Sequence, residues 1–207
     1  CLGHNHYLDV GIADDYGKPL IMKNPFCLHE EDYGILWKHY EFRNDTFEVR
    51  RSRRLVVSFF TTVGNYDYGF FWYFYQDGSI QLEVKLTGII QTAAIMPGES
   101  YPWRGMVAEG LGGPTHQDFF NAPLDMMVDG ERNTVTEHEF RPRPFGPDNP
   151  YGNVFDTTSR VLSREGQAAR EADGRTGRFW KIINSNETNS VGEATGYKLM
   201  VHASPVM

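Results

Sequence analysis

Apolar and polar residues alternate most regularly between residues 79 and 87. One side of an extended chain would carry the apolar side chains of Ile80, Leu82, Val84 and Leu86. This period of two predicts a β-strand with one buried face. Residues 68–75 are almost entirely aromatic, and the Asp77-Gly78 pair between the two segments is a strong hairpin signal. The pattern predicts two antiparallel strands joined by a tight turn.

Other segments of strand-like composition extend this pattern along the chain. Residues 54–62 are rich in Val and Phe and are typical of a buried strand, and residues 88–94 continue the meander. A second hairpin is expected at Asp129-Gly130, between residues 118–128 and residues 134–140. The remaining predictions are closing strands at 178–183 and 197–202, loops at 96–114 and 141–152, and a helix at 163–173.

The composition agrees with an all-β fold. The 207 residues include 21 Gly, 11 Pro, 4 Trp, 11 Tyr and 14 Phe, and long helix-periodic stretches are scarce. A hydrophobic content of 40% excludes intrinsic disorder, and the length is that of one domain or most of one. We find no internal repeat and no linker, so we expect residues 1–207 to form a single piece of one domain.

The charge balance argues against two classes of partner. Twenty basic and 27 acidic side chains give a net charge of −7, which provides no electrostatic basis for binding nucleic acid or an anionic membrane. The one dense basic run, residues 50–54, is flanked by Asp45 and Glu48, and a solvated strand edge explains it better than an anion site. The longest apolar runs, 56–60 and 70–75, fall far short of the ~20 residues of a membrane-spanning helix.

The two cysteines, Cys1 and Cys27, bracket a hairpin-like segment that turns near residues 15–19. They form either a disulfide, which implies an oxidising compartment, or two buried thiols, and their spacing leaves both possibilities open. The chain begins at Cys1 rather than Met and ends at Met207 without a terminal stop feature. We expect a piece truncated at both ends.

Two polar groups near the amino end carry weak signals. The run 29–32 reads His-Glu-Glu-Asp and resembles the start of a zinc-protease motif, but Tyr33 occupies the position of its second histidine. A satisfied polar network is therefore the better interpretation of this run. His4 and His6 share one side of a strand and could share a metal ion, although an isolated pair is weak support.

A third group carries more specific chemistry. Tyr66 lies between Asn65 and Asp67, directly after a glycine at which the backbone can bend. His116 and Asp118 lie two residues apart on an expected strand, so their side chains share one face. A histidine nitrogen suits copper, and a redox copper ion beside a tyrosine would let O2 oxidise the ring. On composition alone, a core tyrosine in an aromatic strand remains the plainer interpretation.

The chain resembles the copper amine oxidases, whose consensus is T-x-x-N-Y-D/E, in the segment TTVGNYDYGFFWYFYQDGSIQLEVKLTG. The stretch around the family's two bridged cysteines resembles CLGHNHYLDVGIADDYGKPLIMKNPFCLHEEDYGILWKH, and the family's copper loop, usually H-x-H, resembles GLGGPTHQDFFNAPLDMMVDG. Further matches are GPDNPYGNVF, READGRTGRFWKI and GYKL. The resemblance covers essentially all residues in order. It implies a fragment of a large antiparallel β-sandwich, the catalytic domain of that family.

The resemblance implies roles for individual residues. Tyr66 matches the tyrosine that is self-processed to topaquinone, Asn65 matches the neighbour that orients the quinone ring, and Asp67 matches the acidic motif position. His116 matches the first copper histidine. Asp118 stands where the family has its second copper histidine, which makes its role as a ligand doubtful.

Further implications of the resemblance concern structural features. It implies a disulfide between Cys1 and Cys27, and a peripheral structural metal site, for calcium or another divalent ion, formed by Asp125 with the carbonyl of Met126. The third copper histidine would lie beyond Met207, and the catalytic-base aspartate would precede Cys1. The chain by itself is therefore expected to lack a complete active site.

The activity implied by the resemblance is oxidation of primary amines by O2, with copper and topaquinone, to an aldehyde, ammonia and H2O2. The family further implies a homodimer, and either an oxidising compartment, secreted or periplasmic, or the peroxisome. The first alternative is a catalytically impaired relative that serves as a binding or scaffolding module because Asp118 replaces a copper histidine. The second is a lectin-like β-sandwich that binds through exposed Trp and Tyr.

Overall fold

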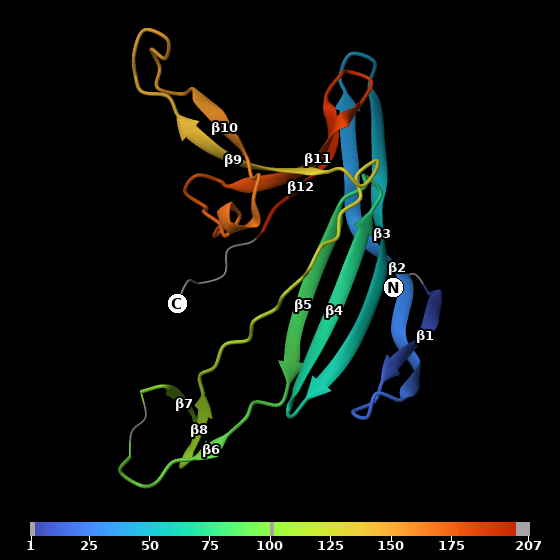
Figure 1. Cartoon of the computed structure of the whole chain (residues 1–207), viewed down its shortest axis with the longest axis vertical. Helices are drawn as coiled ribbons and strands as arrows, with labels where there is room; N and C mark the ends of the chain where they lie inside the picture. The colour runs from blue at the N-terminus through green and yellow to red at the C-terminus, as the bar shows by residue number, and fades with distance from the viewer. Residues whose placement is uncertain (1–2, 100–101, 202–207) are drawn as a thin grey trace. The chain divides into compact units, whose positions relative to one another are not determined.

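The computed structural model describes residues 3–99 and 102–201, which fold largely into antiparallel β-sheet (Figure 1). This described part contains three sheets, with strand orders β1-β2-β3-β4-β5, β10-β9-β11-β12 and β6-β8-β7. The first sheet comprises β1 (Asn5–Ala13), β2 (Pro19–Glu41), β3 (Thr46–Val63), β4 (Tyr66–Tyr75) and β5 (Ile80–Gly88). The others comprise β6 (Ala93–Ala94), β7 (Arg104–Ala108), β8 (Leu111–Pro114), β9 (Thr134–Pro142), β10 (Phe155–Val161), β11 (Phe179–Thr188) and β12 (Ala194–Leu199). The predicted all-β, antiparallel class is confirmed.

The chain separates into two compact units, Cys1–Asp118 and Phe119–Met207. The first unit holds the five-stranded and three-stranded sheets, and the second holds the four-stranded sheet. The described residues contain no helix with the length and apolar character that spanning a bilayer requires.

The five-stranded sheet is a meander in which each strand pairs with its neighbours in sequence. The predicted hairpin at Asp77-Gly78 joins β4 to β5, and the Asp77 carboxylate accepts a hydrogen bond from the backbone N–H of Ser79 at 2.8 Å. The turn expected near residues 15–19 joins β1 to β2. These two turns confirm that short-range turn chemistry and alternation were sufficient to locate the strands around them.

Ion pairs link β2 to β3 along the basic run at residues 50–54. The cross-strand pairs are Arg51–Asp32, Arg53–Glu30 and Arg54–Glu31. The expectation of a solvated strand edge is confirmed for residues 50–53, because the β3–β4 ladder begins only at Arg54 and these residues pair with β2 alone. Carboxylates on β2 pair with these arginines, which accounts for the basic run without a bound anion.

The core of this sheet lies at the centre of β3 and β4. Val56 and Tyr73 are paired across these strands, and both are 0% exposed. The guanidinium carbon of Arg54 lies 3.7 Å from the ring centroid of Tyr73. The Tyr73 hydroxyl donates a hydrogen bond to Glu83 at 2.6 Å. A buried aromatic ring with a satisfied hydroxyl therefore anchors one face of β4.

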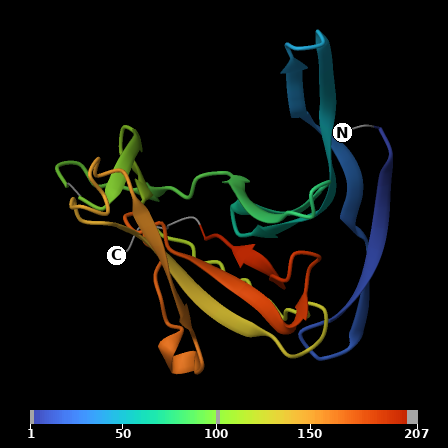
Figure 2. The ribbon, with the colours of Figure 1, turned by 90° about the horizontal axis from the view of Figure 1, so that it is seen from above.

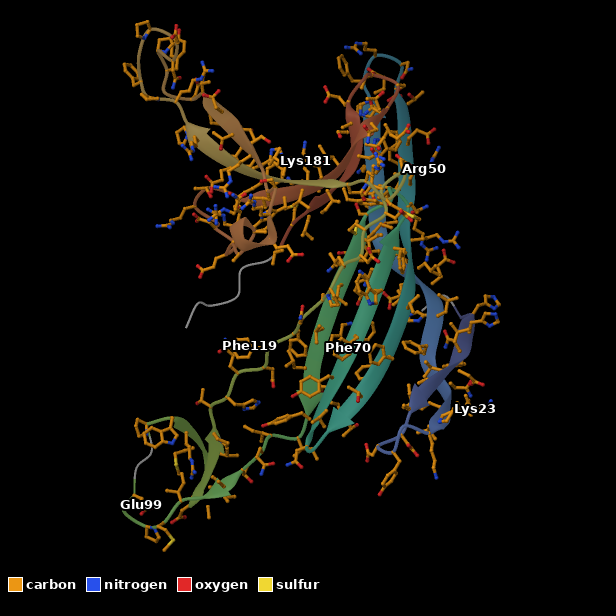
Figure 3. All side chains as sticks on the ribbon, in the orientation of Figure 1. Lys23, Arg50, Phe70, Glu99, Phe119 and Lys181 are labelled. Atoms are coloured by element: carbon orange, nitrogen blue, oxygen red, sulfur yellow. The ribbon has the colours of Figure 1, made fainter. Side chains whose placement is uncertain are left out.

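The opposite face of β4 carries the even-numbered residues, because side chains alternate along a strand. Phe70 stacks on Phe59 of β3 with ring centroids 4.9 Å apart, and Figure 3 shows Phe70 within the sheet. Tyr66 and Tyr68 share this even-numbered face at the beginning of the strand. The two faces of β4 thus have different surroundings.

The four-stranded sheet of the second unit has its own small core. Its strands β9, β11 and β12 lie side by side in Figure 2, coloured yellow to red. Phe179, Trp180 and Ile182 on β11 are buried, and His138 of β9 stacks on Phe179 with ring centroids 4.8 Å apart. Burial of these rings supplies the hydrophobic stabilisation of the unit.

The predicted strand at 118–128 and its hairpin are wrong. No strand is assigned to residues 118–128, where Pro123 removes one backbone donor. The Asn133 side chain instead binds both backbone groups of Val128, accepting from its N–H at 2.9 Å and donating to its carbonyl at 3.1 Å. The chain therefore reaches β9 through an irregular loop rather than a two-residue turn.

Three other segments also differ from the prediction. The expected helix at 163–173 is reduced to a single 3-10 turn, Glu165–Gln167, because Gly166 disfavours helix and no side chain caps the turn. The expected loop at 96–114 contains β7 and β8. The glycines there permit close packing, since a Cβ on Gly112 would lie 2.6 Å from the Ile95 side chain. The expected continuation at 88–94 is interrupted: β5 ends at Gly88, and Ala93–Ala94 form β6 in a different sheet.

Candidate active site

The site begins at the turn between β3 and β4. Only Gly64 and Asn65 separate the paired residues Val63 and Tyr66. Gly64 has φ +62°, a value that favours glycine. Two-residue turns with glycine in the first central position suit the twist of a β-hairpin. This turn places Tyr66 as the first residue of β4, at the end of the sheet.

Gly88 of β5 lies opposite Tyr66 in the ladder. It has φ +107°, and a Cβ at this position would lie 2.5 Å from the Asn65 carbonyl oxygen and 2.8 Å from Tyr66 Cα. Any side chain at residue 88 would therefore push the Tyr66 backbone out of register. The backbone position of Tyr66 depends on this glycine.

Two groups contact the Tyr66 phenol, and a third is linked to it indirectly. Its ring centroid lies 5.0 Å from that of His116, with the planes tilted by 38°. Its hydroxyl accepts a hydrogen bond from the backbone N–H of Gln91 at 3.2 Å. The Gln91 side chain in turn accepts a hydrogen bond from the Asn65 amide at 2.9 Å. Asn65 is thus connected to the Tyr66 hydroxyl through Gln91.

Asp118 completes the polar end of the site. Its Oδ1 accepts a hydrogen bond from the Tyr68 hydroxyl at 3.2 Å, and its Oδ2 lies 3.6 Å from Nε2 of His116. The side chains of His116 and Asp118 are 44% and 29% exposed. Burial and the hydrogen bond to Asp118 raise the pKa of the Tyr68 phenol above its ordinary value.

These groups line an open cavity of about 280 Å³. Its wall is formed by Tyr66, Tyr68, Leu86, Thr87, Gly88, Ile90, His116 and Asp118. The cavity combines apolar surface with a small number of convergent polar groups, which is typical of a small-molecule site.

The donor set fits part of a metal centre. An imidazole nitrogen and a carboxylate oxygen 3.6 Å apart can bind one ion through ordinary metal–ligand bonds of ~2 Å. The described residues contain no cluster of three or more His, Cys, Asp or Glu side chains that could hold a metal ion. This part of the chain therefore offers two ligands, His116 and Asp118.

Asp67, the acidic neighbour of Tyr66, belongs to the other face of β4. Its carboxylate accepts a hydrogen bond from the Thr62 hydroxyl at 2.5 Å. The predicted site residues therefore divide: Tyr66 and the pair at 116 and 118 converge, whereas Asp67 stabilises the hairpin beside them.

The Cys1–Cys27 disulfide stays a prediction, because Cys1 lies outside the described residues. Cys27 lies in β2, with its Sγ 3.5 Å from Nδ1 of His29. Nε2 of His29 lies 3.1 Å from Glu31, which also accepts from Arg54. The polar run at 29–32 thus forms part of a structural network, as the sequence indicates.

The remaining candidate ligands do not join the site. His4 and His6 are exposed, and His6 pairs with Leu28 in the β1–β2 ladder. Asp125 and Met126 lie in the irregular segment before Val128, and the structural metal site stays a prediction.

Comparison with known proteins identifies the family. The family described as "Copper amine oxidase, enzyme domain" matches residues 1–207. The chain belongs to the copper amine oxidase family. The match extends over every element described above, including both units.

Related copper amine oxidases are known from bacteria, plants and fungi. The chain is 50% identical over 207 residues to histamine oxidase of Arthrobacter globiformis, which covers 100% of this chain and 30% of that relative. It is 44% identical over 204 residues to a peroxisomal diamine oxidase of Nicotiana tabacum, which covers 97% of this chain and 26% of the relative. The chain thus spans less than a third of the length of these relatives.

The fold is also shared with a solved member of the family. The copper-containing benzylamine oxidase of Hansenula polymorpha superposes with a TM-score of 0.83 and 30% identity, covering 99% of this chain and 32% of that one. The expectation of a copper amine oxidase fragment is therefore confirmed. The names of these relatives do not favour the non-catalytic alternative over the oxidase interpretation.

Sequence reasoning missed three residues of the site. Local sequence signals place Gly88 and Gln91 only in a continuing meander, and they do not distinguish Tyr68 from the other aromatic residues of the strand. The Gly64-Asn65 pair, a known two-residue hairpin signal, could have located the turn and placed Gly88 opposite Tyr66. The Tyr68 contact with Asp118 joins residues 50 positions apart and has no local sequence signal.

Proposed function

We propose that the protein containing this chain is a primary-amine oxidase that depends on copper and on topaquinone derived from Tyr66. The reaction converts RCH2NH2, O2 and H2O into RCHO, NH3 and H2O2. One observation carries the proposal: the Tyr66 phenol lies against the His116 imidazole at an open cavity, 5.0 Å between ring centroids. Family membership gives this juxtaposition its chemical meaning.

His116 and Asp118 would hold the copper ion through Nε2 and Oδ2. Copper supplies redox chemistry with O2 next to the phenol, and topaquinone supplies a carbonyl that can react with an amine. The chain's own contribution is to position the reacting ring. Gln91 donates to the Tyr66 hydroxyl, and Asn65 holds Gln91 in place.

The other roles implied by the family rest on this proposal. We propose that Asp67 acts indirectly, by fixing the β3–β4 hairpin through Thr62. The Cys1–Cys27 disulfide, the structural divalent-metal site at Asp125 and Met126, and the placement of residues 1–207 within one larger catalytic β-sandwich are part of the same proposal. A homodimer is proposed on family grounds, and size-exclusion chromatography with light scattering would test it.

Quinone staining of the intact, copper-loaded protein tests the function. Redox cycling with nitroblue tetrazolium should stain the wild type, and a primary amine should yield aldehyde and H2O2. Tyr66→Phe should abolish both signals. Tyr16→Phe is the matched control, because Tyr16 is 88% exposed in the β1–β2 turn, and it should retain both. Staining that survives Tyr66→Phe would contradict the assignment.

A further inference from the structure

Two tyrosines on β4 match the spacing of the two candidate ligands. Tyr66 and Tyr68 lie two residues apart on one face of the strand, and His116 and Asp118 lie two residues apart on the segment beside it. Tyr66 contacts His116, with 5.0 Å between ring centroids, and the Tyr68 hydroxyl contacts Asp118 at 3.2 Å. Each of the two candidate ligands therefore contacts a different tyrosine.

The two carboxylate oxygens of Asp118 have different neighbours. Oδ1 accepts the hydrogen bond from Tyr68, and Oδ2 faces the imidazole of His116 at 3.6 Å. A hydrogen bond to one oxygen restricts rotation of the carboxylate, and it makes binding of one ion by both oxygens less favourable. Because the Asp118 side chain is 29% exposed, solvent and side-chain rotation would otherwise compete for this orientation.

We propose that Tyr68 is a positioning residue that holds Asp118 as a one-oxygen metal ligand, with Oδ2 directed to the ion shared with His116. The proposal rests on the function proposed above, since it assumes that an ion occupies this site. It assigns a role to Asp118, which stands where the family usually has histidine. The carboxylate remains usable as a ligand because a neighbouring hydroxyl fixes its geometry.

Hydrogen-bonding partners of this kind influence metal affinity measurably. Loss of a group that orients a metal ligand typically lowers affinity by ~10–100-fold. Tyr68→Phe removes only the hydroxyl and keeps the ring that lines the cavity, so it is the suitable probe. Its effect should require the carboxylate at residue 118, because Tyr68 acts on the ion only through Asp118.

The test is a double-mutant cycle on the intact apo protein, titrated with Cu(II) alone against a competing chelator. Tyr68→Phe should weaken the Cu(II) Kd by ~10–100-fold, and Asp118→Ala by at least as much. In the Asp118→Ala background, Tyr68→Phe should change the Kd by less than about twofold. Tyr16→Phe is the control and should match the wild type. The Cu(II) EPR spectrum should change in Tyr68→Phe and Asp118→Ala alike.

Several outcomes would overturn the inference. One is a Cu(II) Kd of the Tyr68→Phe variant equal to that of the wild type. Another is an equal loss of affinity on Tyr68→Phe in the wild type and in the Asp118→Ala variant. Unfolding of the apo variants, followed in parallel, identifies any loss caused by misfolding, and Asp118→Asn then replaces Asp118→Ala in the cycle. Quinone staining of the same samples separates the two proposals. If copper binds and the effect of Tyr68→Phe depends on Asp118, but no quinone forms, only the proposed function is contradicted. If copper binds and quinone forms, but the effect of Tyr68→Phe does not depend on Asp118, only the inference about Tyr68 is contradicted. If the wild type binds no copper, both are contradicted.

Discussion

The two faces of β4 each present a tyrosine hydrogen-bonded to a carboxylate, but in different surroundings. On one face, Tyr73 is 0% exposed and donates to Glu83 at 2.6 Å beneath the Arg54 guanidinium. On the other face, Tyr68 donates to Asp118 at 3.2 Å beside an open cavity. A hydrogen bond from a tyrosine to a carboxylate therefore stabilises the sheet on one side, and on the other it contacts a candidate metal ligand.

Both tyrosine hydroxyls have a raised pKa. Burial and the hydrogen bond to Glu83 raise the pKa of Tyr73 far above its ordinary value, so this phenol stays protonated throughout the useful pH range. Burial and the hydrogen bond to Asp118 also raise the pKa of the Tyr68 phenol. Burial of Tyr73 on one face stabilises the strand, and the other face presents Tyr66 and Tyr68 to the open cavity.

The largest expected effect is on stability, at the buried face. Tyr73→Ala should lower the free energy of unfolding by ~3–5 kcal/mol, because it leaves a large cavity in the sheet core. Tyr66→Phe, on the open face, should cost about 1 kcal/mol or less, since it removes one partly exposed hydrogen-bonding group. Urea unfolding of the intact protein measures both. Similar losses in the two variants would remove the distinction between the faces.

Gly88→Ala tests whether the open face needs the close contact of β5 with the turn. The added Cβ would collide with backbone atoms near Tyr66, so we expect a loss of about 1–3 kcal/mol and a lower quinone yield. Gly98→Ala is the control, because Gly98 also has positive φ, +83°, but no atom lies within 4 Å of its added Cβ. If the control lowers the quinone yield equally, contact with the turn is not the cause.

Acid should weaken the network on the buried face. Burial tends to raise the pKa of Glu31, but hydrogen bonds from His29 and Arg54 outweigh it and hold the pKa below its ordinary value of 4.5. The folded-state pKa is thus depressed, so this contribution to stability is present above pH 4.5 and is lost as pH falls through the folded-state pKa. Glu31→Gln should flatten the pH dependence of the unfolding free energy in that range. An unchanged slope would show that Glu31 is not coupled to folding.

A small effect on stability is also expected at Asn65. Asn65→Ala removes the hydrogen bond to Gln91 and should cost about 0.5–1.5 kcal/mol, as for a single exposed or partly exposed bond. Because Gln91 in turn donates to the Tyr66 hydroxyl, the quinone absorption band should become broader or shift. A normal band with normal stability would indicate that Gln91 keeps its position without Asn65.

The sequence predicted the parts of the fold that depend on local signals. Alternation in residues 79–87 and the Asp77-Gly78 turn located β5 and the β4–β5 hairpin, because period and turn chemistry are read within a few residues. The segment 118–128 misled the prediction, since its apolar residues resemble a strand although no strand partner pairs with it. Pairing partners distant in sequence decide such cases, and they have no local signature.

The candidate site likewise contains residues that local motifs identify and a contact that they do not. The Asn65-Tyr66-Asp67 motif and the spacing of His116 and Asp118 could be recognised because each is short and specific. The contact between Tyr68 and Asp118 depends on how the segment after β8 returns to β4, which residue types alone do not determine. Gly112 is an error of a different kind. Its glycine-rich segment predicts a loop, but the glycine permits close packing and lies in strand β8.

The most direct test of the central claim is to identify the tyrosine that copper and O2 modify. The intact apo protein is exposed to Cu(II) in air, digested, and analysed by peptide mass spectrometry for quinone-modified tyrosine. The arrangement of Tyr66 beside His116 predicts modification at Tyr66 alone, with Tyr68 and Tyr73 unchanged. Modification at Tyr68 instead, or none in a protein that binds copper, would contradict the account.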